Sequence, residues 1–313
     1  MIIDAHNHLG KVGEEGITTP PELHARWMTE MTDPFFPPGA EIPKAVTEGR
    51  TAEEVIAEAD DAGVDMIETM GQLDHGVIPG KPDWFGLCTT NDYVARIQKK
   101  YPSRIIGFGS VNPWKGPEAV REMNRCINDL DLYGIKLYPT YEHYRPDNKE
   151  LMWPIYEKAV ELDIPLIIHM ACTPIIDAWM EYQHPDQIDV VAREFRDLRI
   201  QMAHFGVPWV DECMVMIAHH PNMYADMSFW LAVERPWKIL DQLLRCPGYG
   251  CNYNKLFWGT DTFVPFKTAL DNFRGLNTWA DKLGLPKIPE KDIESMLGDN
   301  FAKFIRLDEK LKK

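Results

Sequence analysis

Five side chains that can bind metal ions stand out because of where they fall in the sequence. His6 and His8 are separated by one residue in the opening "MIIDAHNHLG", while His169 in "IIHM", His204 in "MAHFG" and Asp261 in "WGTD" each end an apolar run. Imidazole and carboxylate groups bind Zn²⁺ and other divalent first-row ions in proteins. A His-x-His pair alone is weak evidence. Five such side chains in similar positions indicate a shared site, because burying them without partners would cost roughly 1–3 kcal/mol each.

The runs that carry these residues belong to a regular series of apolar segments bounded by turn residues, which predicts β-strands. There are eight: "MIIDAH", "VDMIETM", "IIGFGSV", "GIKLYP", "IPLIIHM", "RIQMAHFG", "NMYADMS" and "KLFWGTD".

Amphipathic helical stretches separate most of these predicted strands. "TAEEVIAEADDAG" begins with Thr51 and has Glu54 three residues later, the pattern of a capping box. Strands that alternate with helices favour a parallel sheet, and eight such units predict an α/β protein with a closed (β/α)₈ TIM barrel. Counting elements leaves an open doubly wound sheet as the alternative. No repeat or linker divides the sequence, so we expect one domain over residues 1–313.

Three segments after strands 1, 2 and 8 are too long to be simple connections. They cover residues 9–50, 71–90 and 262–289. In a barrel these long loops lie at the carboxyl ends of the strands, where active sites are built, so we expect lids and specificity loops there. Alternate residues of a strand share a face, so His6 and His8 are expected to project together.

The charge balance disfavours nucleic-acid and membrane binding. The chain has 33 basic and 48 acidic residues, a formal net charge of -15, and no apolar stretch that could cross a bilayer. The opening lacks the pattern of a secretory signal, so we expect a cytoplasmic protein. Six scattered cysteines predict free thiols, with a Cys246–Cys251 disulfide as the less favoured alternative.

The arrangement of the five side chains resembles that of the amidohydrolase superfamily. In addition, the C-terminal "MLGDNFAKFIRL" resembles the "GNAxRLF" ending of the amidohydrolase-2 branch, typified by 2-amino-3-carboxymuconate-6-semialdehyde decarboxylase. The resemblance covers residues 1–307.

This resemblance implies one divalent metal ion held by His6, His8, His169 and Asp261. Zn²⁺ is the favoured ion and Mn²⁺ the alternative. His204 is then left free beside the metal as a catalytic acid/base group, and Asp261 is expected to accept a proton as well as bind the metal.

Lys136 in "GIKLYP" allows two interpretations. In two-metal members of the superfamily, a carboxylated lysine at the end of strand four bridges the metals. The alternative, a lysine that binds a substrate carboxylate or pairs with a nearby acid, is favoured because the branch usually works with a single metal ion.

Substrate contacts are expected on the loops after the strands. Aromatic side chains there suit a flat aromatic or unsaturated substrate, although loop packing is the alternative for most of them. An arginine can bind a carboxylate with two hydrogen bonds, with a surface salt bridge as the alternative. The main candidates besides Lys136 are Tyr138, Arg145, Trp230 and Arg235, and the further candidates are Trp27, Phe35, Phe36, Trp84, Tyr141, His143, Tyr144 and Trp179.

The resemblance implies a metal-dependent enzyme but leaves its reaction open. Non-oxidative decarboxylation of a small aromatic or unsaturated carboxylic acid is the leading hypothesis. Hydrolysis of a lactone, amide or C–C bond is the second, and a non-catalytic binding protein is the third. The His-x-His opening differs from the Glu-x-His of several hydroxybenzoate decarboxylases, which disfavours salicylate-type substrates. By the same resemblance we expect a homodimer or higher homo-oligomer.

Overall fold

The eight predicted strands lie side by side in chain order in one parallel sheet. The computed structural model describes residues 1–18, 48–72, 88–173, 175, 178–230, 235–262 and 264–311. The strands are β1 (Ile3–Asp4), β4 (Met66–Met70), β5 (Ile105–Ser110), β6 (Gly134–Leu137), β7 (Leu166–His169), β8 (Ile200–Ala203), β9 (Met223–Asp226) and β10 (Leu256–Phe257). Each falls within its predicted apolar run.

Backbone hydrogen bonds close the sheet between its two edge strands. The N–H of Ala5 donates to the carbonyl of Trp258 at 3.0 Å, and the N–H of Asp261 donates to the carbonyl of His6 at 2.8 Å. The predicted (β/α)₈ barrel is therefore confirmed, and the open sheet is excluded.

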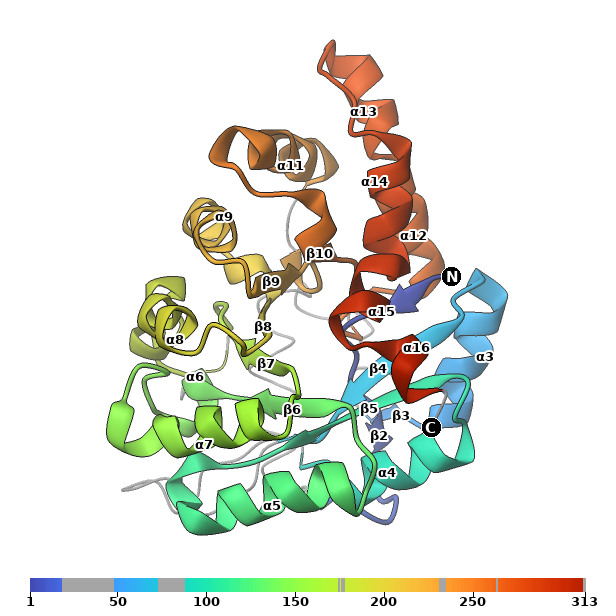
Figure 1. Ribbon diagram of the computed structural model, residues 1–313. Coiled ribbons are helices and arrows are strands. Elements are labelled where there is room, and N and C mark those ends of the chain that lie inside the picture. The colour runs from blue at the N-terminus through green and yellow to red at the C-terminus, as the bar shows by residue number, and fades with distance from the viewer. Residues whose placement is uncertain are drawn as a thin grey trace.

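Helices surround the barrel, as the alternating sequence pattern predicts (Figure 1). Thr51 caps α3 through the predicted capping box with Glu54, which satisfies N–H groups that the first turn leaves without partners. The helices that follow the strands along the chain are α3 (Ala52–Ala62), α4 (Asn91–Lys100), α5 (Pro117–Asn128), α7 (Lys149–Glu161), α8 (Asp189–Glu194), α9 (Val210–His219) and α11 (Pro236–Tyr249).

The C-terminal segment packs against the first and last strands. Phe301 and Phe304, on α15 (Asn300–Phe304), contact Phe257 of β10 with ring centroids 5.4 and 5.1 Å away. Gly298 lies so close to the N-terminal strand that a Cβ there would overlap the carbonyl oxygen of Met1. The "MLGDNF" part of the family-like ending therefore has a packing role at the amino ends of the strands.

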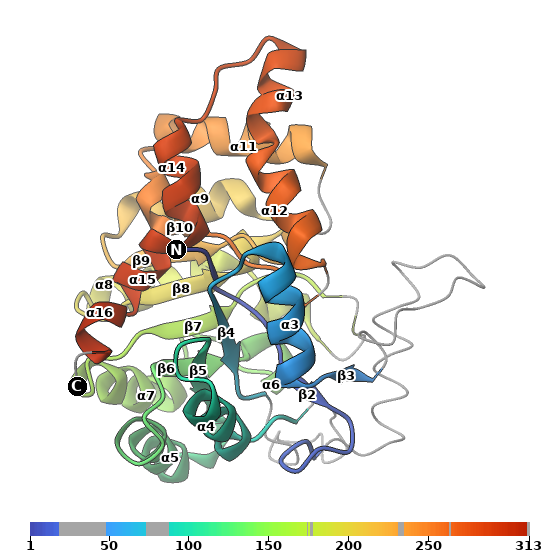
Figure 2. The ribbon, with the colours of Figure 1, turned by 90° about the vertical axis from the view of Figure 1, so that its right-hand side faces the viewer.

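The long segments contain structure of their own. Within residues 9–50, β2 (Gly10–Lys11) pairs with β3 (Gly49–Arg50) in a small antiparallel sheet. Within residues 262–289, the expected loop is largely helical: it forms α12 (Phe266–Arg274), which packs against α3, and α13 (Leu276–Leu283), which packs against α11 (Figure 2). Most of the segment after β4 lies outside the described residues.

The described residues include no helix that is both long and apolar enough to cross a membrane. All six cysteines are free thiols, including Cys246 and Cys251, as predicted.

Candidate active site

His6 and His8 lie just beyond β1 rather than on it. The strand ends at Asp4, so the two imidazoles converge through the shape of the following turn and not through strand alternation, which corrects the expectation. Asp4 holds this turn, because its carboxylate accepts from the backbone N–H of His6 at 3.2 Å, from the Asn7 amide at 2.8 Å and from the backbone N–H of Thr260 at 2.9 Å. Burial raises the pKa of Asp4 to about 7, and its hydrogen bonds with Thr260 and Asn7 oppose this rise.

One carboxylate oxygen of Asp261 lies close to the Nε2 atoms of both histidines. Its Oδ1 lies 3.3 Å from His8 Nε2 and 3.8 Å from His6 Nε2. Asp261 has a φ of 52°, in the left-handed region that non-glycine residues adopt at a cost of about 1–3 kcal/mol. The backbone hydrogen bond from Asp261 to His6 holds it there, and such held strain is typical of functional sites.

His169 and His204 form a second pair next to this group. His204 Nε2 lies 3.1 Å from His169 Nδ1, while His204 Nδ1 lies 3.7 Å from Asp261 Oδ2. The rings of His6 and His204 have centroids 4.5 Å apart. The structure therefore brings all five predicted side chains together, with His204 between His169 and the other three.

Burial disfavours the charged form of three imidazoles of this site. It is the largest cause of the lowered pKa of His6, His169 and His204, and the positive charge of Lys136 lowers all three further. Burial also raises the pKa of Asp261, against the effect of its hydrogen bond with His8. Neutral imidazoles have the lone pairs that metal binding requires.

Lys136 is completely buried beside this cluster. Its Nζ lies 3.2 Å from His6 Nε2 and 5.2 Å from the centroid of the Tyr138 ring. Burial lowers the pKa of the Lys136 ammonium to about 8, while the charges of Asp226, Asp261 and Glu68 act to raise it. The carboxyl group of Glu68 is also buried, which raises its pKa well above the ordinary value. The carboxyl groups of Asp226, Asp261 and Glu68 thus lie near Lys136, and the choice between its two interpretations stays a prediction.

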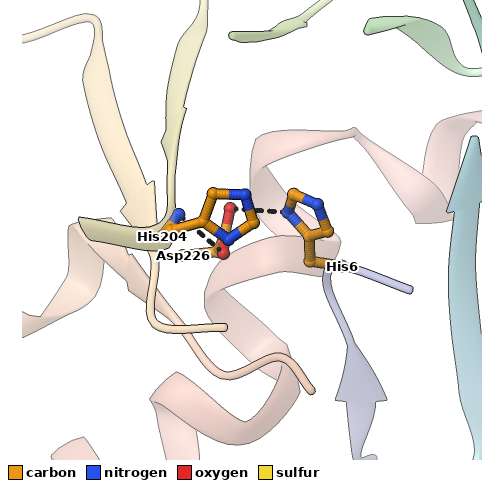
Figure 3. Close-up of side chains that lie close together, drawn as sticks. All are labelled: His6, His204 and Asp226. Atoms are coloured by element: carbon orange, nitrogen blue, oxygen red, sulfur yellow. Dashed lines mark hydrogen bonds and ion pairs between the residues drawn. The ribbon is translucent and has the colours of Figure 1, made fainter. Parts of the chain in front are cut away.

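Asp226 is a site residue that the sequence interpretation missed. It ends β9, and Figure 3 shows its carboxylate between His6 and His204. His6 Nδ1 lies 3.1 Å from Asp226 Oδ2, and the backbone N–H of His204 donates to Asp226 Oδ1 at 3.1 Å. The signal was present, because Asp226 lies near the end of the predicted run "NMYADMS", as His169 and His204 lie near the ends of theirs.

Among the residues that the structure describes, two groups of three have ligand atoms close enough for one metal ion, and their hydrogen bonds distinguish them. In the group of His6, His204 and Asp226, each Asp226 oxygen already accepts at least two hydrogen bonds, so it has no lone pair to spare. In the group of His6, His8 and Asp261, the two Nε2 atoms face the same carboxylate oxygen. The second group fits a divalent ion; the first does not.

His169 has a free lone pair of the kind that the implied ligand role needs. Its Nε2 lies 3.2 Å from the carbonyl oxygen of Ala171, which can only accept, so Nε2 carries the proton and Nδ1 is bare in the neutral ring. This Nδ1 points toward the other imidazoles of the site and lies 3.1 Å from His204 Nε2. Its binding of a metal stays a prediction.

The predicted substrate contacts occupy different surroundings. The Tyr138 hydroxyl donates to the carbonyl of Gly71 at 2.8 Å, and the Arg145 guanidinium makes two hydrogen bonds of 2.9 Å with Asp147 at the surface. Trp230 is fully buried and donates to Gln242 at 3.1 Å, which is a packing role, and Arg235 is an exposed residue before α11. Their contacts with a substrate stay predictions.

Of the further candidates that the structure describes, one borders the site and the others pack elsewhere. The Tyr141 ring lies 4.9 Å from that of His169, so it borders the site, whereas Trp179 stacks on His143 with ring centroids 5.0 Å apart. Tyr144 is buried in the core. The candidates outside the described residues are Trp27, Phe35, Phe36 and Trp84.

The sequence profile of the amidohydrolase family, in its amidohydrolase-2 branch, matches residues 3–307. The chain belongs to the amidohydrolase family. The resemblance seen in the sequence is therefore confirmed, and the amidohydrolase match includes every residue of the candidate site.

Two curated relatives of this amidohydrolase are named as a hydratase and a decarboxylase. A 2-keto-4-carboxy-3-hexenedioate hydratase of Sphingobium sp. is 26% identical over 204 residues, which cover 58% of this chain and 56% of the hydratase. A 2-amino-3-carboxymuconate-6-semialdehyde decarboxylase of Dictyostelium discoideum is 32% identical over 79 residues, or 25% of this chain and 22% of the decarboxylase. The aligned parts thus span little more than half, and about a fifth, of these relatives.

Among solved structures, a dihydroxybenzoic acid decarboxylase of Polaromonas sp. has the same fold. It superimposes with a TM-score of 0.62 at 18% identity and covers 98% of this chain and 97% of its own. That enzyme was solved with bound manganese and the inhibitor 2-nitroresorcinol.

Proposed function

We propose that this amidohydrolase is a metal-dependent lyase that removes the carboxyl group from a small aromatic or unsaturated carboxylic acid. The observation that carries the proposal is the convergence of His6, His8 and Asp261 at 3.3 and 3.8 Å beside the buried ammonium of Lys136. We take the single domain of residues 1–313 as the catalytic unit.

The residues that would hold the ion are His6, His8, His169 and Asp261. Three imidazoles and one carboxylate favour Zn²⁺, and the manganese in the Polaromonas enzyme supports Mn²⁺ as the second candidate. A bound divalent ion would supply a positive charge that polarises substrate oxygens and lowers the pKa of water.

Lys136 is suited to attract the substrate carboxylate. Its ammonium is buried next to His6, and in such a low-dielectric place a charge pair is stronger than in water. Tyr138 supports this position, since its ring lies 5.2 Å from Lys136 Nζ and its hydroxyl is tied to Gly71.

His204 is the group that we assign to proton transfer. When the bond to the carboxyl group breaks, its electron pair stays on the substrate carbon, and a proton must replace the departing CO₂ there. His204 lies 3.7 Å from Asp261 and is hydrogen-bonded through Nδ1 to Ser228 at 2.9 Å, so its ring is held beside the metal ligands. A positioned histidine of this kind can take up a proton from water or from the substrate acid and deliver it to that carbon.

Hydration of a carbon–carbon double bond is the second candidate. It is favoured by the hydratase relative, whose alignment covers more of this chain than that of the decarboxylase relative. The same His204 would then take a proton from water instead of giving one to carbon.

The test is a panel of aromatic and unsaturated carboxylic acids incubated with the purified protein and Zn²⁺ or Mn²⁺. Release of CO₂ is the expected result. Water addition without CO₂ would replace decarboxylation by the second candidate, and cleavage of lactones or amides alone would make the protein a hydrolase. If the metal-loaded protein converts none of these compounds, the result would support the hypothesis of a non-catalytic binding protein.

We further propose a cytoplasmic homodimer or higher homo-oligomer. The proposal rests on the family resemblance, and light scattering during gel filtration tests its oligomeric part. A mass of one chain, 36.1 kDa, would contradict it.

A further inference from the structure

Asp226 is the most heavily hydrogen-bonded carboxylate of the site, and its two oxygens have separate sets of donors. Oδ1 accepts from the backbone N–H groups of His204 and Ser228, both at 3.1 Å, and from the Ser228 hydroxyl. Oδ2 faces His6 Nδ1 at 3.1 Å and accepts from the Gln201 amide at 2.7 Å. The side chain is completely buried, so water does not compete for these bonds.

The Oδ2 side determines which nitrogen of His6 carries the proton. A carboxylate oxygen can only accept, so His6 must place its proton on Nδ1. Nε2 is then bare, and this is the atom that faces Asp261 at 3.8 Å. Metal-binding histidines need this arrangement, because the ring nitrogen opposite the metal donates to a fixed acceptor.

The Oδ1 side acts on His204 through Ser228. The Ser228 hydroxyl donates its only hydrogen to Asp226, so its oxygen must accept from His204 Nδ1, which lies 2.9 Å away. The proton of the neutral His204 ring is therefore on Nδ1. Its bare Nε2 faces the bare Nδ1 of His169 at 3.1 Å, so the lone pairs of both rings converge there with no proton between them. One carboxylate thus specifies the proton positions of two rings that come from different strands.

We propose that Asp226 is a positioning residue that places the imidazole protons of His6 and, through Ser228, of His204 on Nδ1. It leaves both Nε2 atoms free for the metal and for proton transfer. This inference deepens the proposed function and rests on its metal site.

Replacing Asp226 by asparagine should keep the hydrogen bonds at the Oδ1 position and reverse the direction of the one with His6 at the Oδ2 position. The amide has one accepting oxygen, and the three donors at Oδ1 include two backbone N–H groups that cannot turn away. The oxygen therefore takes the Oδ1 place, and the amide NH₂ faces His6 Nδ1. His6 must then accept at Nδ1 and carry its proton on Nε2, and this proton must be displaced before Nε2 can bind a metal ion.

The experiment measures ¹⁵N chemical shifts of the histidine rings by long-range ¹H–¹⁵N correlation in metal-free protein. We expect the protein to show His6 with a protonated Nδ1 and a bare Nε2, and D226N to show the reverse. We also expect D226N to bind Mn²⁺ or Zn²⁺ about 10- to 100-fold more weakly in a competition titration. A protonated Nε2 on His6 of the unmodified protein contradicts the inference even if D226N fails to fold.

Two matched variants separate this role from a structural one. Ser228→Ala removes the acceptor of His204 and one of the three donors to Asp226 Oδ1, but it leaves the contact between Oδ2 and His6 intact. It should therefore lower kcat more than it changes KM and leave the metal affinity within about threefold. Asp4→Asn removes an equally buried carboxylate that contacts the backbone of His6 but no imidazole, so the His6 proton should stay on Nδ1. The inference is wrong if D226N keeps the proton on Nδ1, or if D226N and D4N change it alike. A protein with the expected proton positions that binds neither ion would instead contradict the proposed function.

Discussion

His8 Nε2 lies 3.3 Å from Asp261 Oδ1, although the two residues follow the first and the last strand of the barrel. The contact depends on closure of the sheet, because the backbone bond from Asp261 to His6 joins the same two chain segments. His8 is the most exposed member of the group, with 18% of its side chain accessible, whereas Asp261 is 8% accessible. The pair therefore faces the open side of the cluster, where a metal ion and a substrate could both reach it.

His8→Ala should weaken the binding of Mn²⁺ or Zn²⁺ by a factor of at least 10, because it removes one of the proposed direct ligands. The dissociation constant measured by competition with a chromophoric chelator checks this. His219→Ala is the control, since His219 is an exposed histidine at the end of α9. Equal affinities of the two variants would remove His8 from the ligand set.

His204→Ala should retain the metal but lose turnover by about 10²- to 10⁴-fold, because it removes the proton-transfer group and no proposed ligand. Metal analysis and steady-state kinetics of the same preparation check both parts. The matched control is His220→Ala, which removes a buried histidine that pairs with Asp189 at 2.8 Å outside the site. If His204→Ala loses its metal while the control keeps it, His204 is a ligand.

The barrel and most of the site could be predicted from the sequence for the same physical reason. Parallel strands buried on both faces must be apolar, so a polar residue at the end of such a run is conspicuous, as in "IIHM" for His169 and "WGTD" for Asp261. The strand ends then bring these residues to one rim.

The parts that could not be predicted depend on local backbone conformation and on hydrogen-bond partners. The positive φ angles of His204, 61°, and Asp261, 52°, leave no mark in the residue types. The turn that presents His6 depends on Asp4 and Thr260, which meet only when the barrel closes. Asp226 ends a strand as well, but its role depends on hydrogen bonds with His6 and Gln201 in other segments of the chain, and the sequence does not reveal these.

Lys136→Met should leave one metal ion per chain and raise KM for a carboxylate substrate more than it lowers kcat. The reason is that Lys136 is proposed to attract the carboxylate and not to bridge two metals. Metal analysis and the kinetic constants check this. Lys255→Met is the control, because Lys255 donates to two backbone carbonyls, of Ile217 and His220, away from the site. Two ions per chain, with loss of metal in Lys136→Met, would support the carboxylated bridge.

Gly298→Ala should lower the free energy of unfolding by about 1–3 kcal/mol, because a Cβ there would overlap the Met1 carbonyl. Gly248→Ala, in α11, has no neighbour within 4 Å of the added Cβ and should raise the free energy by roughly 0.5–1 kcal/mol. Urea unfolding of both variants measures these changes. Similar effects of the two substitutions would contradict the close packing of the C-terminal segment on β1.

The most direct test of the metal site is anomalous scattering from a crystal of the protein grown with Mn²⁺. The expected result is one peak per chain, within about 2.5 Å of ligand atoms of His6, His8, His169 and Asp261. Crystals with no peak at these four residues, or with a peak bound by Asp226 instead, would contradict the account.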